Sequence, residues 1–318
     1  MPLDHYVSQV HLRNFYSPVL QNRMHAIRKS DLKTFTPRSE DVCRTADGRT
    51  NSYLQPEHVV EDFLLSVEPR YNAALNTLRN GEPDVAAVHA MAGFVAYVST
   101  SAPAAIRIGT APLQSVLQAT AEMLDRQGRI PPAPEALGNK TIAELLNDGT
   151  VHFDVDGKYP QALGISGILQ RLSVFGNSPW EILHNEAPDN PFLTSDFPVA
   201  IEVRGNNGIV NRIVPLAPDL AIRILPDTSL ARTKPDLTFS GFRYRQLRLG
   251  RADVSALNRL IVQCAEEIVF HRDAHAWIPG FVSKNRHYRV ECVTTRIPYG
   301  TGIMHVAIQR VVATGRAA

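Results

Sequence analysis

The first residues of the chain hold three polar side chains that a helix would place in one stripe. His5, Gln9 and Arg13 recur every four residues, and residues four apart lie on the same helix face. An imidazole can act as a general acid or base, and an arginine can hold a phosphate or carboxylate with two parallel hydrogen bonds. We therefore predict a site for a small-molecule or phosphate-bearing substrate here, with Gln9 and Arg13 as substrate-binding groups.

A carboxylate late in the chain is the expected partner of this imidazole. Asp196 follows the short run Thr194-Ser195 and precedes Pro198, which places it at the end of a strand. An imidazole and a carboxylate within reach of each other can share acid and base work. This pairing predicts a hydrolase or phosphodiesterase with His5 and Asp196 as catalytic residues and Ser195 beside the substrate.

The same residues also have a structural interpretation. Buried polar groups are normally hydrogen-bonded, so His5, Gln9, Arg13 and Asp196 could form a network that pins the N-terminus to a sheet. The protein would then be a non-catalytic binding or regulatory module. Asn258 begins the last long helix and is expected to face inward, either as a substrate-binding group or as a partner of the Asp196 strand.

A divalent metal is the candidate cofactor, with Glu68, His271 and His275 as possible ligands. Glu68 precedes Pro69, and a kink at that proline would turn the carboxylate inward. His271 and His275 are four apart, a spacing that suits a metal pair on a helix. The alternatives are a solvated carboxylate and two histidines that complement the C-terminal end of a helix. No third ligand accompanies the histidine pair in the sequence.

Nucleic acid is a weaker candidate partner. The basic stretch over 242–251 alternates, which places Arg243 and Arg245 on one strand face and aromatic residues on the other. Such a pattern can bind single strands, but it also suits a solvent-facing edge strand whose charges prevent aggregation. The formal net charge is only +2, so we favour the edge strand.

The cysteine content and the hydropathy of the chain indicate its cellular compartment and whether it spans a membrane. The three cysteines lie far apart and show no CxxC spacing, so neither a disulfide framework nor a cysteine-built zinc site is expected. We therefore predict a cytoplasmic protein. No apolar run reaches the length of a membrane span, so no membrane partner is expected.

Hydrophobic periodicity predicts an α+β fold in one compact domain over 1–318. The part over about 1–176 is mainly helical, and the part over about 177–312 is rich in strands that form a mixed or antiparallel sheet. We expect a short helix from residue 6 or 8 to residue 15, a weak strand over 22–29, and helices over 56–80 (broken at Pro69), 84–100, 112–126, 141–147, 159–175 and 253–271. We expect strands over 180–184, 192–194, 199–203, 209–214 and 220–225, and a hairpin of 288–297 with 302–312.

Two motifs indicate a family. The chain opens with His5-Tyr6-Val7-Ser8-Gln9, followed by Leu12-Arg13-Asn14-Phe15, and later carries Phe192-Leu193-Thr194-Ser195-Asp196-Phe197-Pro198. These runs resemble the bacterial domain of unknown function 4238 family, whose members begin His-Tyr-Val-Pro-Gln and carry Phe-Ile-Thr-Ser-Asp-Asn-Pro. The resemblance covers most of the chain and implies a fold outline and a candidate site, but no activity.

The chain also departs from the family pattern before Pro103. Members carry a glutamine and an arginine there, and this chain has Ser99 and small residues instead. The departure adds a third interpretation, in which the protein is a tailoring enzyme of a biosynthetic pathway with the family fold and an altered site.

Overall fold

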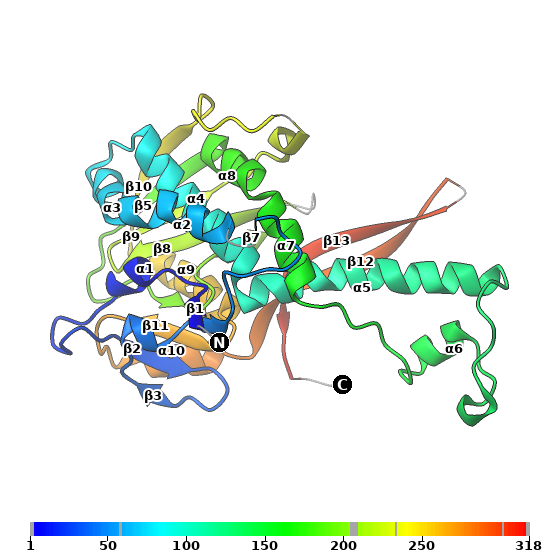
Figure 1. The fold of residues 1–318 in the computed structure, drawn as a ribbon. Helices are drawn as coiled ribbons and strands as arrows, with labels where there is room; N and C mark the ends of the chain where they lie inside the picture. The colour runs from blue at the N-terminus through cyan, green and yellow to red at the C-terminus, as the bar shows by residue number, and fades with distance from the viewer. Residues whose placement is uncertain (1–2, 57–58, 204–208, 233, 301, 316–318) are drawn as a thin grey trace.

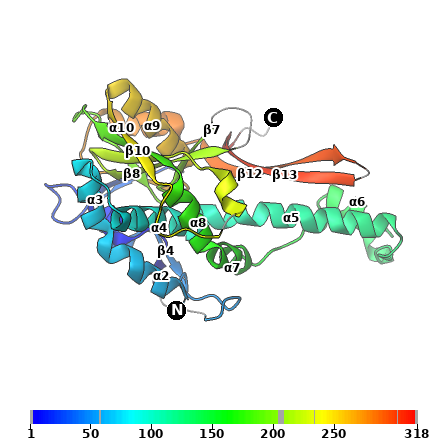
Figure 2. The ribbon, with the colours of Figure 1, turned by 90° about the horizontal axis from the view of Figure 1, so that it is seen from above.

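A five-stranded mixed sheet lies between two groups of helices in the computed structural model, which describes residues 3–56, 59–203, 209–232, 234–300 and 302–315 (Figures 1 and 2). The strand order is β10-β5-β9-β8-β7, in which β10 runs parallel to β5 and the other neighbours are antiparallel. The strands are β5 (Pro179–Asn185), β7 (Ala200–Val203), β8 (Val210–Ala217), β9 (Leu220–Ile224) and β10 (Arg243–Leu249). The predicted α+β class is confirmed.

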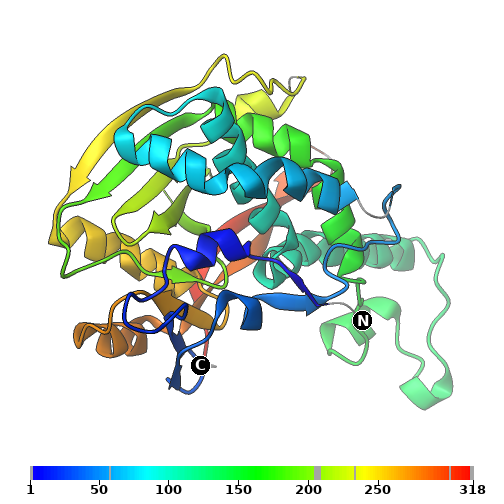
Figure 3. The ribbon, with the colours of Figure 1, turned by 60° about the vertical axis from the view of Figure 1, so that its left-hand side comes forward.

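Helices cover both faces of this sheet, and those of one face come mostly from the first half of the chain (Figures 2 and 3). Buried aromatic side chains such as Trp180 and Phe94 join the sheet and the helices in one core. On one face lie α2 (Val59–Val67), α3 (Tyr71–Asn80), α4 (Val85–Ser101) and α8 (Ile168–Asn177), with α7 (Lys158–Ser166) beside them; on the other lie α9 (Arg251–Cys264) and α10 (Trp277–Asn285).

Local sequence signals account for the helix boundaries in the first half. Pro69 interrupts the helical run at the 3-10 turn η2 (Glu68–Arg70), as predicted. Gly81 ends α3 with a φ of +80°, a left-handed conformation that glycine adopts without strain. Asp84 caps α4, because its side chain accepts a hydrogen bond from the backbone N–H of Ala87 at 2.7 Å.

Three predicted helices differ from the structure. The helix predicted over 112–126 begins earlier, at Pro103, and Pro112 lies inside it. The stretch over 159–175 forms two helices, α7 and α8, which meet at Gly167. The predicted helix over 253–271 is wrong beyond Cys264, because β11 (Ile268–His271) pairs with two strands from distant parts of the chain. These partners are non-local, so the periodicity of the sequence does not indicate them.

The N-terminal residues form small sheets beneath the main body. Strand β1 (Leu3–His5) pairs with β4 (Arg44–Ala46), and the short helix α1 (Gln9–Arg13) follows β1. A second sheet has the order β3-β2-β11-β6, made of β2 (His25–Arg28), β3 (Thr34–Phe35), β11 and β6 (Thr194–Ser195). The N-terminus is therefore tied to the strand that carries the Thr-Ser-Asp motif.

A long helix and a hairpin project side by side from the body, and we call this part of the molecule the arm (Figures 1 and 2). It consists of α5 (Pro103–Arg126), the following segment with α6 (Ile142–Asn147), and the antiparallel strands β12 (Tyr288–Tyr299) and β13 (Gly302–Ala313). The predicted hairpin is confirmed. Among the described residues no single helix is long and apolar enough to cross a membrane, although α4 and α5 together, bent by 59°, meet that test by length and composition.

Candidate functional site

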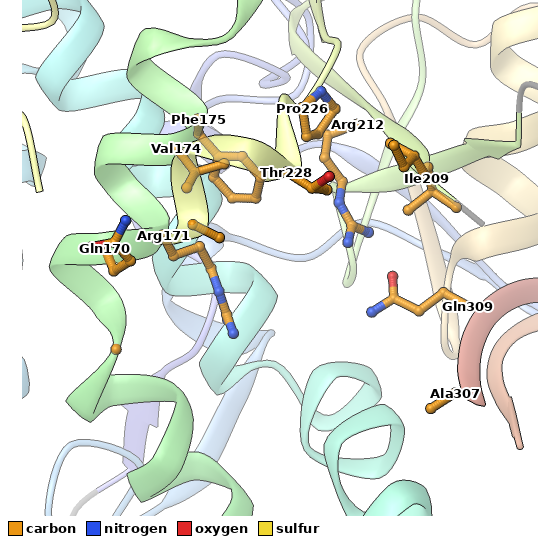
Figure 4. A pocket seen from close by; sticks show the side chains of 13 residues that line it. Gln170, Arg171, Val174, Phe175, Ile209, Arg212, Pro226, Thr228, Ala307 and Gln309 are labelled. Atoms are coloured by element: carbon orange, nitrogen blue, oxygen red, sulfur yellow. The ribbon is translucent and has the colours of Figure 1, made fainter. Parts of the chain in front are cut away.

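A cavity of about 660 Å³ opens where the helices, the sheet and the arm meet, and we call it the arginine pocket (Figure 4). Arg171 reaches it from α8, Arg212 from β8, and Gln309 from β13 at the base of the arm. A smaller cavity of about 110 Å³ adjoins it, lined by the same three side chains together with Ser99 of α4. Three layers of the fold thus contribute polar groups to one hollow.

The two guanidinium groups are held differently. Arg171 donates from one terminal nitrogen to the Ser99 carbonyl at 3.1 Å and to Thr100 Oγ1 at 2.5 Å, which fixes its direction. No hydrogen bond or ion pair within the described part of the chain reaches the Arg212 guanidinium, and its Nε is buried without a partner. Arg212 is therefore available to an external acceptor.

Other polar atoms at the pocket also lack partners in the part of the chain that the structure describes. Gln309 Oε1 and Ser99 Oγ are both buried and make no hydrogen bond there. Buried polar atoms are normally paired, so a group of unpaired ones around a cavity indicates a place for a ligand or water.

The cations facing the cavity have no counter-charge among the lining residues that the structure describes. Among the described residues that line it, none is an aspartate or a glutamate. Burial, with a smaller contribution from the nearby positive charge of Arg171, lowers the pKa of Arg212 to about 10. Burial also lowers the pKa of Arg171. Both groups stay charged at neutral pH, so the pocket carries two half-buried positive charges.

Arg223, on the neighbouring strand β9, provides a contrast. Its terminal nitrogens pair with Glu181 at 2.5 Å and with Glu202 at 3.2 Å. The chain thus neutralises this partly buried arginine internally. The difference between Arg223 and Arg212 supports an external anion as the partner of Arg212.

The rest of the wall is largely apolar. Side chains from α8, from the start of β8 and from the segment 226–231 form it: Val174, Phe175, Ile209, Val210, Pro226 and Ala231. Gln170 holds that segment by donating to the Leu230 carbonyl at 2.9 Å. The pocket therefore offers cations at one end and an apolar surface at the other.

The predicted N-terminal stripe is brought together as a separate cluster. His5 Nε2 lies 3.2 Å from the Ser39 carbonyl, and Gln9 Nε2 lies 3.5 Å from His5 Nδ1. Gln9 Oε1 accepts from Arg13 at 3.0 Å and from Ser39 Oγ at 3.2 Å. Burial lowers the pKa of His5, and the Ser39 carbonyl opposes that change. His5 is therefore neutral at pH 7, donating through Nε2 and accepting through Nδ1.

Asp196 occupies a different environment from His5. Its two carboxylate oxygens accept from the backbone N–H groups of Glu266, Glu267 and Ile268, at 2.9, 2.7 and 3.0 Å. Burial raises the pKa of Asp196 to about 7, while these donors oppose the rise. No hydrogen bond links Asp196 to His5 among the described residues. Asp196 thus pins the turn before β11, and its hydrogen bonds go to that backbone and not to the cluster of His5, Gln9 and Arg13.

Asn258 and Ser195 also make hydrogen bonds to nearby backbone groups. Asn258 donates to the Pro191 carbonyl and accepts from the Leu193 N–H, both at 2.9 Å, so α9 holds the segment before β6. Ser195 is fully buried, and its Oγ accepts from the Phe197 N–H at 3.2 Å. Neither side chain lines the arginine pocket.

A buried histidine that the sequence reasoning missed joins α1 to this motif. His11 lies between Tyr71 OH, at 2.7 Å from Nδ1, and Thr194 Oγ1, at 3.0 Å from Nε2. Burial lowers the pKa of His11 to about 3, so the ring is neutral. The contact explains how the N-terminal segment is anchored.

Of the metal candidates, His271 and His275 line one cavity, and Glu68 is not among its lining residues. Glu68 is half-buried and its charge acts on His5, as expected of a carboxylate beside a kink. His271 lies in β11 and His275 in the following loop, so the predicted helical pairing of these two histidines is wrong. Across the described residues, no group of three or more His, Cys, Asp or Glu side chains is placed to hold a metal.

A second cavity, of about 390 Å³, contains these two histidines together with His25. The rings of His25 and His271 stack with centroids 5.1 Å apart and planes inclined by 11°. His271 Nδ1 donates to the Asp273 carbonyl at 2.9 Å. Burial lowers the pKa of His271 to about 4 and also lowers that of His25, so these two stacked rings are neutral at pH 7.

The basic stretch is an edge strand, as we favoured. β10 is the outermost strand of the main sheet. Arg245 pairs with Glu181, and Arg248 pairs with Glu186 at 3.0 Å. These acidic partners reduce the charge that the strand could offer to a nucleic acid.

Comparison with known proteins identifies the family. Residues 4–275 match the model of the family described as Protein of unknown function (DUF4238). The chain belongs to the DUF4238 family. No curated protein and no solved structure matches this family member. The match includes Arg171 and Arg212, whereas Gln309 and the whole β12–β13 hairpin lie beyond it.

Two residues at the pocket of this DUF4238 protein could have been noticed in the sequence. Arg212 interrupts the apolar run over 209–214, and a charge inside a buried strand is uncommon. Ser99, where the chain departs from the family pattern, lines the cavity that adjoins the pocket. Nothing in their spacing indicates that α8, β8 and β13 converge, because this depends on the tertiary structure.

Proposed function

We propose that this DUF4238 protein binds a small molecule that carries a phosphate or a similar oxyanion at one end and an apolar body at the other. The main support for this proposal is that Arg171 and Arg212 face one cavity whose described lining contains no carboxylate. Guanidinium groups match the oxygens of phosphates and carboxylates through paired N–H donors. The apolar wall formed by residues such as Phe175 suits the rest of the ligand.

A binding role is better supported than acid–base catalysis in this pocket. Its described lining contains no histidine, cysteine, lysine, aspartate or glutamate. Such side chains are the usual general acids and bases. Hydrolase or phosphodiesterase chemistry at His5 and Asp196, a role as a tailoring enzyme, a divalent metal cofactor and a cytoplasmic location remain predictions made from the sequence.

Calorimetric titration of the full chain with phenyl phosphate, inorganic phosphate and phenol tests the proposal. Phenyl phosphate should bind more tightly than inorganic phosphate because it also covers the apolar wall, and phenol should bind weakly. Each of the substitutions Arg171→Met and Arg212→Met should weaken phenyl phosphate binding by roughly ten-fold or more, since a hydrogen bond to a charged group contributes about 1.5–3 kcal/mol.

Arg248→Met is the matched control, because Arg248 lies on the exposed edge strand, with 81% of its side chain exposed. This variant should bind phenyl phosphate as the wild type does. Equal losses in all three variants would show that the effect is general charge attraction and would contradict the proposal. So would a wild-type protein that does not bind phenyl phosphate.

A further inference from the structure

The arginine pocket adjoins the smaller cavity of about 110 Å³, which we call the inner cavity. Four side chains line both hollows and lie where the two meet: Arg171, Phe175, Arg212 and Gln309. Figure 4 shows Arg171, Arg212 and Gln309 pointing into this space from three different elements. A ligand that extends from the arginine pocket into the inner cavity therefore passes both guanidinium groups.

The inner cavity ends inside the protein. Its remaining walls are Ser99 of α4, Ala105 and Ile108 of α5, and Phe197. The last three belong to the hydrophobic core, with only 9%, 7% and 3% of their surface exposed. Because the core closes the far side, a group that enters from the arginine pocket has to end there.

Unpaired polar atoms surround this closed end. Ser99 Oγ, Gln309 Oε1 and Arg212 Nε are buried and have no hydrogen-bond partner in the described parts of the chain. The neighbouring hydroxyl of α4 is satisfied in the ordinary way, since Thr100 Oγ1 donates to the Ala96 carbonyl at 2.8 Å. The Ser99 hydroxyl is therefore available to donate to a ligand, and a glutamine carboxamide can donate through its nitrogen.

The size of the inner cavity suits one terminal anionic group. A water molecule takes up about 30 Å³ of the liquid, so about 110 Å³ holds a group of about four non-hydrogen atoms. The end of a phosphate monoester is such a group, with one phosphorus and three oxygen atoms. A diester carries a second chain beyond the phosphorus, and the closed end leaves no room for it.

We infer, building on the proposed binding function, that the inner cavity holds the terminal phosphate of a monoester and that the protein selects monoesters over diesters. The two guanidinium groups, the Ser99 hydroxyl and the Gln309 amide approach from four elements, which suits a tetrahedral group. No carboxylate among the described lining residues of either cavity opposes the anion. The apolar body of the ester then lies in the arginine pocket, beside Val174.

Calorimetry at pH 5 with phenyl phosphate and methyl phenyl phosphate tests this selectivity. A phosphate monoester has its second pKa near 6, so both probes carry about one negative charge at pH 5 and differ in the second ester group. Phenyl phosphate should bind about ten-fold more tightly or better, because the extra methyl group overfills the closed end. Equal affinities would overturn the inference and leave the proposed function standing, since the phosphate would then lie in the open pocket. Binding of neither probe would contradict both.

Filling the inner cavity gives an independent measurement. Ser99→Met should occupy it and weaken the binding of inorganic phosphate by about ten-fold or more, while both arginines keep their charges. Ser283→Met is the matched control, because Ser283 lies on α10 and lines neither cavity. It should bind inorganic phosphate as the wild type does. Unchanged phosphate binding in a folded Ser99→Met would contradict a phosphate in the inner cavity.

Gln309→Met keeps the length of the side chain and removes its amide, so it tests the cavity without filling it. This variant should bind inorganic phosphate about ten-fold more weakly, because a hydrogen bond to a charged group is lost. Gln118→Met on α5 is the control, since Gln118 lines neither cavity, and its binding should not change. If Gln309→Met bound phosphate as the wild type does while Arg212→Met did not, the anion would lie outside the inner cavity and the inference would fail.

Discussion

Arg171 on α8 and Arg212 on β8 face the same cavity, and the positive charge of the first lowers the pKa of the second. Two cations held this way, with no carboxylate in the described lining, cost stability in the free protein. Proteins maintain such arrangements where a ligand supplies the missing charge. We therefore expect Arg212 to serve the proposed binding and its ion-paired neighbour Arg223 to serve folding.

Replacing Arg212 should leave the free protein at least as stable as the wild type. Arg212→Met removes a charge that has no partner among the described residues and keeps a side chain of similar length. Arg223→Met is the matched control. It strips a partner from Glu181, whose side chain is only 2% exposed, and should lower the free energy of unfolding by about 3–5 kcal/mol. Urea denaturation measures both, and a large loss in Arg212→Met would show that Arg212 is structural.

Ligand binding should depend on pH through the ligand. Burial lowers the pKa of Arg212 only to about 10, so both arginines remain charged between pH 5 and 8. A phosphate monoester gains its second negative charge near pH 6, so its affinity should rise up to about ten-fold between pH 5 and 7.5. Sulfate keeps its charge over this range, and its affinity should stay flat. Above pH 10 both ligands should lose affinity as Arg212 loses its proton. A rise with sulfate would instead indicate a titrating protein group.

Asp196 should matter more for folding than its exposed counterpart in the predicted site. Asp196→Ala leaves three buried backbone N–H groups without their acceptor and should cost about 3 kcal/mol or more of unfolding free energy. Arg13→Ala removes a hydrogen bond at an exposed position and should change stability by less than about 0.5 kcal/mol. Comparison of the two urea midpoints checks this order. If Asp196→Ala were as stable as the wild type, the prediction of a catalytic Asp196 would regain support.

His11 should make the protein sensitive to acid. Its pKa is about 3 when folded and about 6.5 when unfolded, so the folded state resists protonation. The stability that His11 contributes is complete above pH 6.5 and is lost as the pH falls toward 3, at up to about 1.4 kcal/mol per pH unit. His11→Gln cannot titrate and should show a shallower loss between pH 6.5 and 4.5. His287→Gln, at an exposed position, should follow the wild-type curve. A His11→Gln curve parallel to the wild type would contradict this assignment.

The local elements of the fold follow from nearby residues, and the sequence predicts them well. The break at Pro69, the end of α3 at Gly81 and the capping box of α6 at Thr141 each depend on atoms within a few positions along the chain. The prediction of a helix through His271 failed because the pairing of β11 with β2 and β6 overrides the helical periodicity.

The sequence by itself determined the α+β class, the family and the contact of Gln9 with Arg13, since residues four apart on a helix are neighbours. His5 joins them from strand β1 and not from the predicted helix. Only the tertiary structure decided that Asp196 caps a distant backbone turn, and that Arg171, Arg212 and Gln309 meet at one cavity. The physical reason is that these contacts join elements far apart in the chain. Their meeting is set by how helices, sheet and arm pack, and no spacing along the sequence encodes that distance.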